Sequence, residues 1–177
     1  MTELPFQDRA DAAGKLAGAL AGLRGERPLV LAIPRGAVPM ARLLADDLGG
    51  ELDIVLVKKI GAPGNPELAI GSVDEHGTIA LNENADWLGA DDAYVESEAA
   101  RLLAEMQSRR VRYLGRAPPT RLSGRTVVVV DDGMATGATM ASALRAVRRQ
   151  GPARLVCAIP VASREALALV EPLADET

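Results

Sequence analysis

The chain has 177 residues, of which 48% are hydrophobic and 25% charged, and its formal net charge is −4. This length suits one domain, and the composition excludes a disordered chain. The acidic balance gives no overall attraction to nucleic acid or acidic membranes, so an anionic ligand must be met by local positive groups. The N-terminus lacks the pattern of a signal peptide, no apolar run approaches transmembrane length, and the single cysteine, Cys157, excludes an internal disulfide. We therefore expect a cytoplasmic protein without membrane contact.

Apolar periodicity and turn residues predict helices and strands that alternate along the chain. The predicted helices cover residues 8–23, 38–48, 92–113, 140–149 and 164–173, and the predicted strands cover residues 29–33, 52–57, 68–73, 78–81, 127–130 and 154–160. Residues 60–66 hold two glycines and two prolines and predict a loop, while residues 74–77 predict the turn of a hairpin. This order predicts an α/β fold with a mostly parallel, twisted sheet that is flanked by helices and joined by right-handed crossovers.

Arg35 and Gly36 follow the first predicted strand. Ligands of open α/β sheets bind outside the carboxyl ends of the strands, so this turn is a candidate part of a site. The guanidinium of Arg35 suits phosphate oxygens because it can donate two parallel hydrogen bonds, and Gly36 lets the backbone approach a ligand. The alternative is an ordinary turn with a solvated arginine.

Lys58 and Lys59 follow the second predicted strand. Together with Arg35 they predict a positive pocket, which would draw a polyanion to an otherwise acidic protein. The alternative is that one lysine is solvated while its neighbour pairs with Glu67.

Other polar residues are interpreted as structural. His76, the only histidine, lies at a predicted hairpin tip and reads as a solvated turn residue rather than a general base. Arg109, Arg112 and Arg116 lie on one face of a predicted helix and form a solvated or subunit-facing stripe. Contact of this stripe with nucleic acid is an alternative that the acidic net charge disfavours. The sequence has no cluster of cysteine and histidine with metal-ligand spacing.

The most informative segment is residues 127–139, Val-Val-Val-Val-Asp-Asp-Gly-Met-Ala-Thr-Gly-Ala-Thr. Four consecutive valines suit a strand that is buried on both faces. Asp131 and Asp132 follow at its carboxyl end, and a loop of small residues then leads into a predicted helix. Small side chains let backbone N–H groups surround an anion, and a helix N-terminus adds its positive dipole. The segment therefore predicts acceptors for sugar hydroxyls beside donors for a phosphate, as a ribose 5-phosphate requires.

Two other anion-binding families fit this segment less well. A nucleotide P-loop would need Gly-x4-Gly-Lys-[Ser/Thr], which is absent, and residue 138 is alanine. A receiver domain also uses an acidic pair, but near the start of the chain. Residues 127–139 instead resemble the phosphoribosyl pyrophosphate signature of the type I phosphoribosyltransferases, and the resemblance extends over most of the chain.

The resemblance implies a role for each part of the segment: the acidic pair would hold the ribose hydroxyls, and the loop would hold the 5-phosphate. The residues implied in ribose and phosphate binding are Asp131, Asp132, Gly133, Met134, Ala135, Thr136, Gly137, Ala138 and Thr139. Those implied in pyrophosphate binding are Arg35, Gly36, Lys58 and Lys59, and those implied in catalysis are Arg35, Lys59, Asp131 and Asp132.

The resemblance also implies an organisation of the chain. It indicates the type I, Rossmann-like fold as a single domain over residues 1–177, with a flexible lid at about 60–67 and a small hood or insertion at about 68–118. Residues 33–36 resemble the pyrophosphate loop of the family, which often holds a non-proline cis peptide, here expected near Pro34-Arg35. A homodimer is the assembly that the family commonly forms.

The activity that the resemblance implies is transfer of the 5-phosphoribosyl group from phosphoribosyl pyrophosphate to a nitrogenous acceptor, usually a nucleobase, with release of pyrophosphate. Such a reaction belongs to nucleotide metabolism. Mg2+ would be the cofactor, touched by Asp131 and Asp132 through ribose hydroxyls or water. The alternative is a regulatory protein of the same fold that senses phosphoribosyl pyrophosphate or a nucleotide without turnover.

The sequence leaves the acceptor open. Family members that act on hypoxanthine or guanine carry an aspartate base in the phosphate loop, where this chain has Ala135, and the loop looks closer to that of adenine phosphoribosyltransferases. Base sites usually offer a stacking face, for which Trp87 and Tyr94 are candidates. Relatives usually continue past the last helix, so the alternative is a base site that is incomplete in the form ending at Thr177.

Overall fold

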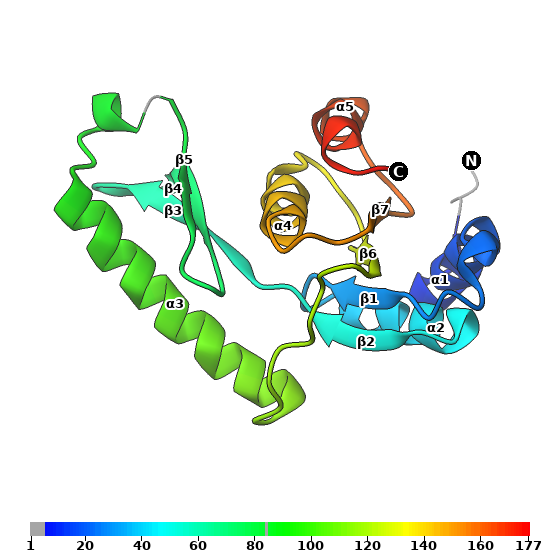
Figure 1. Ribbon diagram of the computed structural model, residues 1–177. Helices are drawn as coiled ribbons and strands as arrows, with labels where there is room; N and C mark the ends of the chain where they lie inside the picture. The colour runs from blue at the N-terminus through cyan, green and yellow to red at the C-terminus, as the bar shows by residue number, and fades with distance from the viewer. Residues whose placement is uncertain (1–5, 84) are drawn as a thin grey trace. The chain divides into compact units, whose positions relative to one another are not determined.

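The computed structural model describes residues 6–83 and 85–177, which form two compact units (Figure 1). The parallel unit comprises the described residues up to Val55 together with Pro119–Thr177, and the antiparallel unit comprises Leu56–Pro118. The single domain expected over residues 1–177 stays a prediction, within which the structure distinguishes these two units. The second part begins twelve residues before residue 68, where the insertion was expected to start.

The parallel unit is built on a four-stranded sheet of order β2-β1-β6-β7, in which each neighbouring pair is parallel. Its strands are β1 Leu29–Ala32, β2 Glu51–Ile54, β6 Thr126–Val130 and β7 Arg154–Ala158. The four valines of β6 are fully buried, as expected for a central strand that is covered on both faces. The predicted α/β class with a parallel sheet is confirmed.

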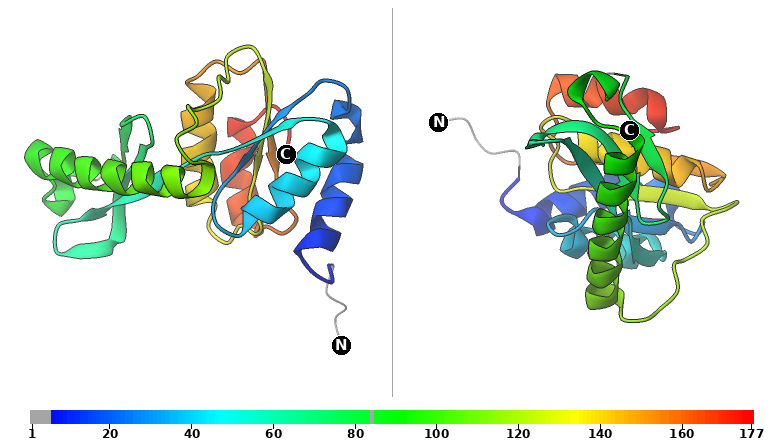
Figure 2. Two further views of the ribbon diagram at one scale, coloured as in Figure 1. Left: turned by 90° about the horizontal axis from the view of Figure 1, so that it is seen from below. Right: turned by 90° about the vertical axis from the view of Figure 1, so that its left-hand side faces the viewer.

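Helices cover both faces of this sheet, as Figure 2 shows. On one face lie α1 Arg9–Ala19 and α2 Ala37–Leu48, and on the other lie α4 Ala138–Arg148 and α5 Arg164–Val170. Short 3-10 helices, η1 Ala21–Leu23 and η3 Glu171–Leu173, follow α1 and α5. The chain runs outward from β1 to β2 and outward in the opposite direction from β6 to β7. The strand order therefore reverses between β1 and β6, and such a switch point forms a ligand crevice at the carboxyl ends of the strands.

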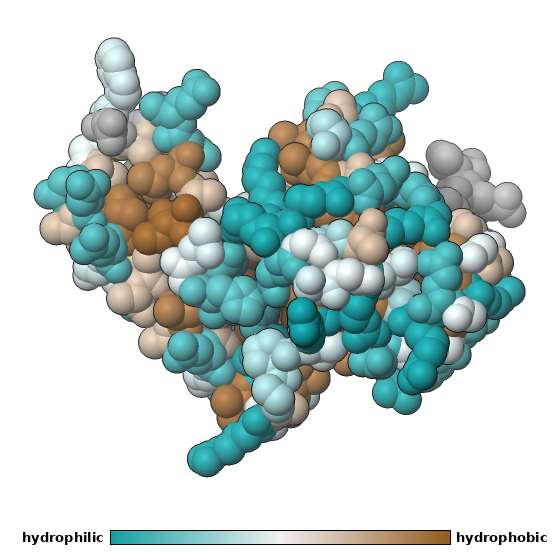
Figure 3. Space-filling model, in the orientation of Figure 1, coloured by the Kyte–Doolittle hydropathy of each residue, from teal (hydrophilic) through white to brown (hydrophobic). Residues whose placement is uncertain are grey.

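The antiparallel unit consists of a three-stranded sheet and one long helix. The strands, in the order β3-β4-β5, are β3 Val57–Ala62, β4 Asn65–Asp74 and β5 Ile79–Leu81. The 3-10 helix η2 Asp86–Leu88 follows β5, and α3 Asp92–Leu114 buries Val95, Ala99, Leu102 and Met106. Leu68 and Leu81 stay about half exposed, and Figure 3 shows apolar side chains gathered over this sheet.

The loop predicted over residues 60–66 is instead the end of the β3–β4 hairpin, while a lid at about 60–67 stays a prediction. Only Pro63 and Gly64 lie outside the two strands, and Gly64 has a positive φ of 72°. The glycines and prolines that suggested a loop are accommodated by shifts of register on either side of Gly61. A Cβ atom on Gly61 would lie 2.6 Å from the backbone of Pro66, so this close pairing depends on glycine.

The remaining predicted elements are present with boundaries within a few residues. The strand predicted over 52–57 ends at Ile54, because residue 57 already belongs to β3 of the other unit. The hairpin predicted around residues 74–77 is formed by β4 and β5, which pair antiparallel. In the described part of the chain, every helix is too short or too polar to serve as a membrane span.

Candidate active site

Residues of the predicted site meet at the carboxyl ends of β1 and β6, the two central strands of the parallel unit. Ala32 lies opposite Val130 in the sheet, and the N–H of Ile33 donates to the carbonyl of Val130 at 2.9 Å. The residues that follow the two strands, Arg35 and Gly36 on one side and the acidic pair on the other, therefore leave the sheet side by side. The peptide bond between Pro34 and Arg35 is cis, which confirms the bond expected there.

The acidic pair, Asp131 and Asp132, is partly buried directly after β6. The N–H of Asp132 donates to Oδ1 of Asp131 at 2.8 Å. Burial raises the pKa of Asp131 to about 6, and the neighbouring carboxylate of Asp132 adds to this increase, although the hydrogen bond from the Asp132 N–H opposes it. Asp131 therefore reaches half protonation near pH 6, and a ligand that donates hydrogen bonds to it would favour the charged form.

Asp132 has a second partner that the sequence did not predict. Nε and Nη2 of Arg9 both donate to its Oδ2, at 2.9 and 2.6 Å. The same carboxylate lies against Gly36, since a Cβ atom on Gly36 would lie only 2.0 Å from Oδ2. The sequence predicted that Gly36 lets the backbone approach a ligand. In the structure, the missing side chain of Gly36 also leaves room for the Asp132 carboxylate. The only sequence signal for Arg9 was its position as a cation at the start of a helix, where positive charge is disfavoured.

The small-residue loop connects β6 to α4 and is hydrogen-bonded to the segment that precedes α5. The N–H of Met134 donates to the carbonyl of Val161 at 2.9 Å, and Ser163 donates to Met134 and Ala135 through its N–H and hydroxyl, at 3.0 and 2.7 Å. Gly137 has a positive φ of 77° and packs against the backbone of Ala166. These contacts tie the loop to the segment around the start of α5 at Met134, Ala135 and Gly137.

The amide donors of this loop lack a hydrogen-bond partner within residues 6–83 and 85–177. Among the described residues, none accepts a hydrogen bond from the N–H groups of residues 135–139. Ala135, Thr136, Ala138 and Thr139 are exposed, and α4 begins at Ala138 with no side chain capping it. A helix N-terminus with unpaired N–H groups and a small-residue loop forms a cradle for an anion such as a phosphate monoester.

Arg35 is exposed at the N-terminal end of α2, and no acceptor in the described part of the chain pairs with its guanidinium. It is therefore available to an anionic ligand at this edge of the parallel sheet. Its position after β1 is the one that the sequence predicted.

Lys58 and Lys59 belong to β3 of the antiparallel unit. Lys58 pairs with Glu105 at 3.0 Å, and Lys59 pairs with Glu67 at 2.9 Å. The pairing of Lys59 with Glu67 is the alternative that the sequence left open. Both lysines thus have carboxylate partners within their own unit, and the contact with Lys59 holds the pKa of Glu67 below its usual range.

The other residues singled out by the sequence have structural surroundings. His76 is exposed at the β4–β5 turn, as predicted, and its backbone N–H donates to Oδ1 of Asp74. The predicted arginine stripe is partly paired, because Arg109 contacts Glu105 and its neighbour Arg110 contacts Glu75 in a largely buried pair.

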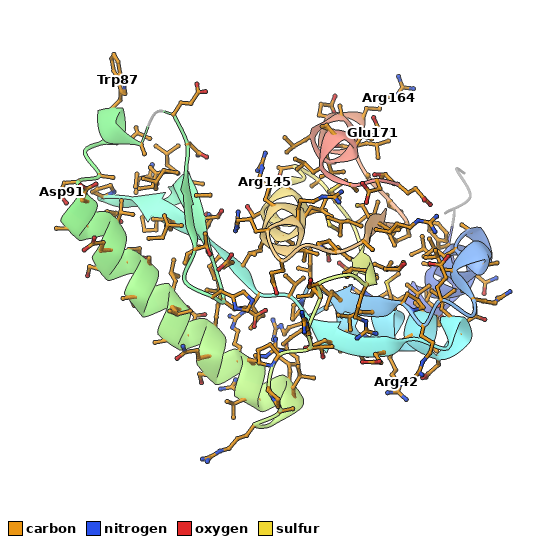
Figure 4. All side chains as sticks on the ribbon, in the orientation of Figure 1. Arg42, Trp87, Asp91, Arg145, Arg164 and Glu171 are labelled. Carbon is orange, nitrogen blue, oxygen red and sulfur yellow. The ribbon has the colours of Figure 1, made fainter. Side chains whose placement is uncertain are left out.

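The two aromatic candidates for an acceptor site differ in their environment. Tyr94 donates its hydroxyl to the carbonyl of Gly61 at 2.9 Å, whereas Trp87 is 90% exposed. Figure 4 shows Trp87 projecting outward from η2. Within their own unit, only Tyr94 is held in one orientation by a hydrogen bond. No group of three or more potential metal-binding side chains occurs among the residues that the structure describes.

Comparison with known proteins places this geometry in a family. Residues 6–175 match the model of the phosphoribosyl transferase domain. A Mycobacterium tuberculosis protein named "Putative phosphoribosyl transferase" is 38% identical over 172 residues, which are 97% of this chain and 39% of that protein. The chain therefore spans about two fifths of the length of the curated relatives it matches.

Solved structures agree with this assignment. The crystal structure of TT1426 from Thermus thermophilus shares 48% identity and a TM-score of 0.84, covering 98% of this chain and 83% of that one. A purine phosphoribosyltransferase from Pyrococcus horikoshii shares the fold with a TM-score of 0.56 at 18% identity, over 98% of this chain and 82% of that one. Because the family model matches residues 6–175 of the 177 in this chain, the chain belongs to the phosphoribosyl transferase family.

Proposed function

We propose that this protein transfers the 5-phosphoribosyl group of phosphoribosyl pyrophosphate to a nitrogenous acceptor and releases pyrophosphate. One observation carries the proposal: a carboxylate pair and a run of unpaired amides follow one another directly between β6 and α4. Ribose hydroxyls need acceptors and a 5-phosphate needs donors, at the spacing of one sugar phosphate. This segment offers both within nine residues, 131–139.

Each part of the site has a proposed role. Asp131 and Asp132 accept hydrogen bonds from the two ribose hydroxyls, and the amides of residues 135–139 bind the 5-phosphate. Arg35 binds the pyrophosphate through its guanidinium fork, which matches phosphate oxygens geometrically. Lys58 and Lys59 would add positive charge to the pyrophosphate after exchanging Glu105 and Glu67 for it.

In the reaction, the bond between ribose C1 and the pyrophosphate oxygen breaks, and a bond from C1 to the acceptor nitrogen forms. Positive charge develops on the ribose ring and negative charge grows on the departing pyrophosphate, which leaves with the electron pair. Asp131 and Asp132, held through the hydroxyls, favour the positive ring, while Arg35 favours the leaving group. The acceptor nitrogen supplies the electron pair of the new bond and releases its proton to water.

The oxygen atoms at this site fit Mg2+, which prefers oxygen ligands, keeps several waters and uses few carboxylates. Asp131 and Asp132 are the residues that would hold it, through ribose hydroxyls or water. When bound, the ion supplies charge neutralisation for the departing pyrophosphate.

The donor half of this proposal is tested by thermal unfolding with phosphoribosyl pyrophosphate and Mg2+. Ligand at 100 times its dissociation constant should stabilise the protein by about 2.7 kcal/mol. For a chain of this size that corresponds to a rise in Tm of about 5–10 °C. A Tm that does not respond to saturating donor would contradict the proposed site.

The catalytic half is tested by pyrophosphate release with a panel of purine and pyrimidine bases. Steady release that depends on one base identifies the acceptor class and supports an enzyme. Donor binding without release for any base would instead support the regulatory alternative, a protein of this fold that senses the donor.

A further inference from the structure

We propose that Arg9 is a positioning residue for donor binding, which holds the Asp132 carboxylate ready to accept a ribose hydroxyl. The inference rests on the proposed function, because it assigns a further residue to the same site. Its starting point is the contact itself: two nitrogens of Arg9 donate to one oxygen of Asp132, at 2.9 and 2.6 Å, across 123 residues of sequence.

Stability alone does not account for this ion pair. The Arg9 side chain is 64% exposed, and exposed ion pairs contribute little to folding because water screens them. Arg9 is also the first residue of α1, where a positive charge opposes the helix dipole, and Asp8 already caps the helix there. A cation at this position disfavours its own helix, which indicates a role for it outside the helix.

The contact divides the oxygens of the acidic pair into held and available ones. Oδ2 of Asp132 is held by Arg9, and Oδ1 of Asp131 is held by the N–H of Asp132. The other oxygen of each carboxylate accepts no hydrogen bond from an N–H group of a described residue, and the two carboxyls interact with each other. One oxygen on each aspartate that is not held by an N–H group is the arrangement that two neighbouring ribose hydroxyls require.

Gly36 and Arg9 together fix the direction of the Asp132 carboxylate. The backbone of Gly36 lies against one side of the carboxylate, where even a Cβ atom would overlap Oδ2. Arg9 holds the same oxygen through two hydrogen bonds, which restrain its rotation. A side chain that is already oriented loses less conformational entropy when a ligand binds.

The charge of Arg9 acts in the same direction. Two adjacent carboxylates repel a donor that carries several phosphate charges, and the guanidinium beside Asp132 offsets one of these carboxylates. Arg9 would therefore favour binding of a sugar phosphate mainly by orienting Asp132, and its solvent-screened charge adds a smaller contribution that any anion would share.

The test compares Arg9→Gln with the matched control Arg24→Gln. Arg24 also donates from Nε and Nη2 to a single carboxylate oxygen, that of Asp47, at 3.1 and 2.7 Å. Asp47 lies near the other end of α2 from Gly36, about 16 Å along the helix axis. Calorimetric titrations with ribose 5-phosphate and with inorganic phosphate then separate binding of the sugar from binding of the phosphate.

We expect Arg9→Gln to lower the affinity for ribose 5-phosphate about tenfold, because the Asp132 carboxylate loses its orienting hydrogen bonds. The affinity for inorganic phosphate should stay within about twofold of that of the unaltered protein. Arg24→Gln should leave both affinities and Tm unchanged, and Arg9→Lys should restore part of the loss. Because Arg9 acts through Asp132, the double variant Arg9→Gln/Asp132→Asn should bind ribose 5-phosphate no more weakly than Asp132→Asn alone.

Three results would overturn the inference. Unchanged ribose 5-phosphate affinity in Arg9→Gln, with normal binding by the unaltered protein, removes the role of Arg9 and leaves the proposed function standing. Equal weakening of both probes shows that Arg9 acts on the phosphate or on the loop instead. If the unaltered protein binds neither probe, the proposed function fails and the role of Arg9 fails with it.

Discussion

The carboxyl edge of the parallel sheet and the antiparallel unit differ in how far their polar groups are paired within the described part of the protein. In the antiparallel unit, Lys58, Lys59 and Arg110 each have a carboxylate partner within 3.0 Å. At the edge of the parallel sheet, the amides of residues 135–139 and the guanidinium of Arg35 have no partner among the described residues. Polar groups that a folded protein leaves unpaired, in a held conformation, indicate where a ligand completes the hydrogen bonding.

The comparison also separates two kinds of candidate residue. Arg35 and the acidic pair need no rearrangement of ion pairs before a donor binds, whereas Lys58 and Lys59 must first give up a carboxylate. Variants at the open edge should therefore have large effects on binding, and variants in the antiparallel unit small ones.

The largest effect is expected from the acidic pair. Replacement of both aspartates, Asp131→Asn/Asp132→Asn, removes two charged acceptors, each worth about 1.5–3 kcal/mol, so the donor should bind roughly 100-fold more weakly or worse. Isothermal titration with phosphoribosyl pyrophosphate and Mg2+ measures this loss. An affinity close to that of the unaltered protein would mean that the ribose does not bind at the acidic pair. The expected difference in effect between variants of the two regions would then be lost.

Gly36→Ala should have the next largest effect. Gly36 has helical backbone angles, φ −59° and ψ −37°, that alanine adopts readily, so we expect the fold to be kept. The new Cβ atom must displace the Asp132 carboxylate, and we expect donor affinity to fall about tenfold as one charged hydrogen bond is lost.

Gly14→Ala is the matched control for that variant. Gly14 lies within α1, and nothing occupies the space where its Cβ would stand. This substitution should raise stability by about 0.5–1 kcal/mol without changing donor affinity. Denaturant unfolding and titration of both variants give the comparison, and a Gly36→Ala protein that binds donor normally would show that Asp132 is not held where the ribose lies.

The pH dependence of folding should report Asp131 directly. Its pKa is raised from 3.8 to about 6 in the folded protein, so the folded state binds more protons between these values. Stability linked to this group is therefore present below about pH 4 and is lost as the pH rises through about 6. Because the side chain is only partly buried, solvent screening limits the loss to on the order of 1 kcal/mol.

Urea unfolding at pH 5 and pH 7.5, without divalent cations, tests this difference. The unaltered protein should lose more stability between the two pH values than Asp131→Asn does, while Glu75, whose pKa is also raised by burial, contributes equally to both proteins. Identical pH dependence in the two proteins would mean that Asp131 is ionised throughout.

The smallest effects are expected in the antiparallel unit. Glu67→Gln frees Lys59 from its partner and should raise pyrophosphate affinity about two- to threefold, the size of an exposed ion pair, while Lys59→Met should lower it by a similar factor. Glu98→Gln, which leaves Arg101 on α3 with only its longer contact to Glu105 at 3.9 Å, is the control and should change nothing. Competition between pyrophosphate and the donor provides the measurement, and equal behaviour of the three variants would remove Lys59 from the site.

Much of this protein follows from local sequence. The four valines predicted a buried strand, the acidic pair predicted the edge where a ligand binds, and the small-residue loop predicted an anion site. Each of these features depends on only a few consecutive residues, so the sequence shows it directly. The cis bond before Arg35 followed from the resemblance of residues 33–36 to a known loop.

Only the tertiary structure decided three other matters. Residues 60–62 and 65–67 belong to strands because pairing between the strands outweighs the effect of the glycines and prolines. Lys59 forms an ion pair with Glu67 across that hairpin, and Arg9 forms one with Asp132, which is 123 residues away in the sequence. Sequence periodicity reports which face of an element is buried, but it contains no information on which distant charge will lie beside it, since that depends on how the elements pack.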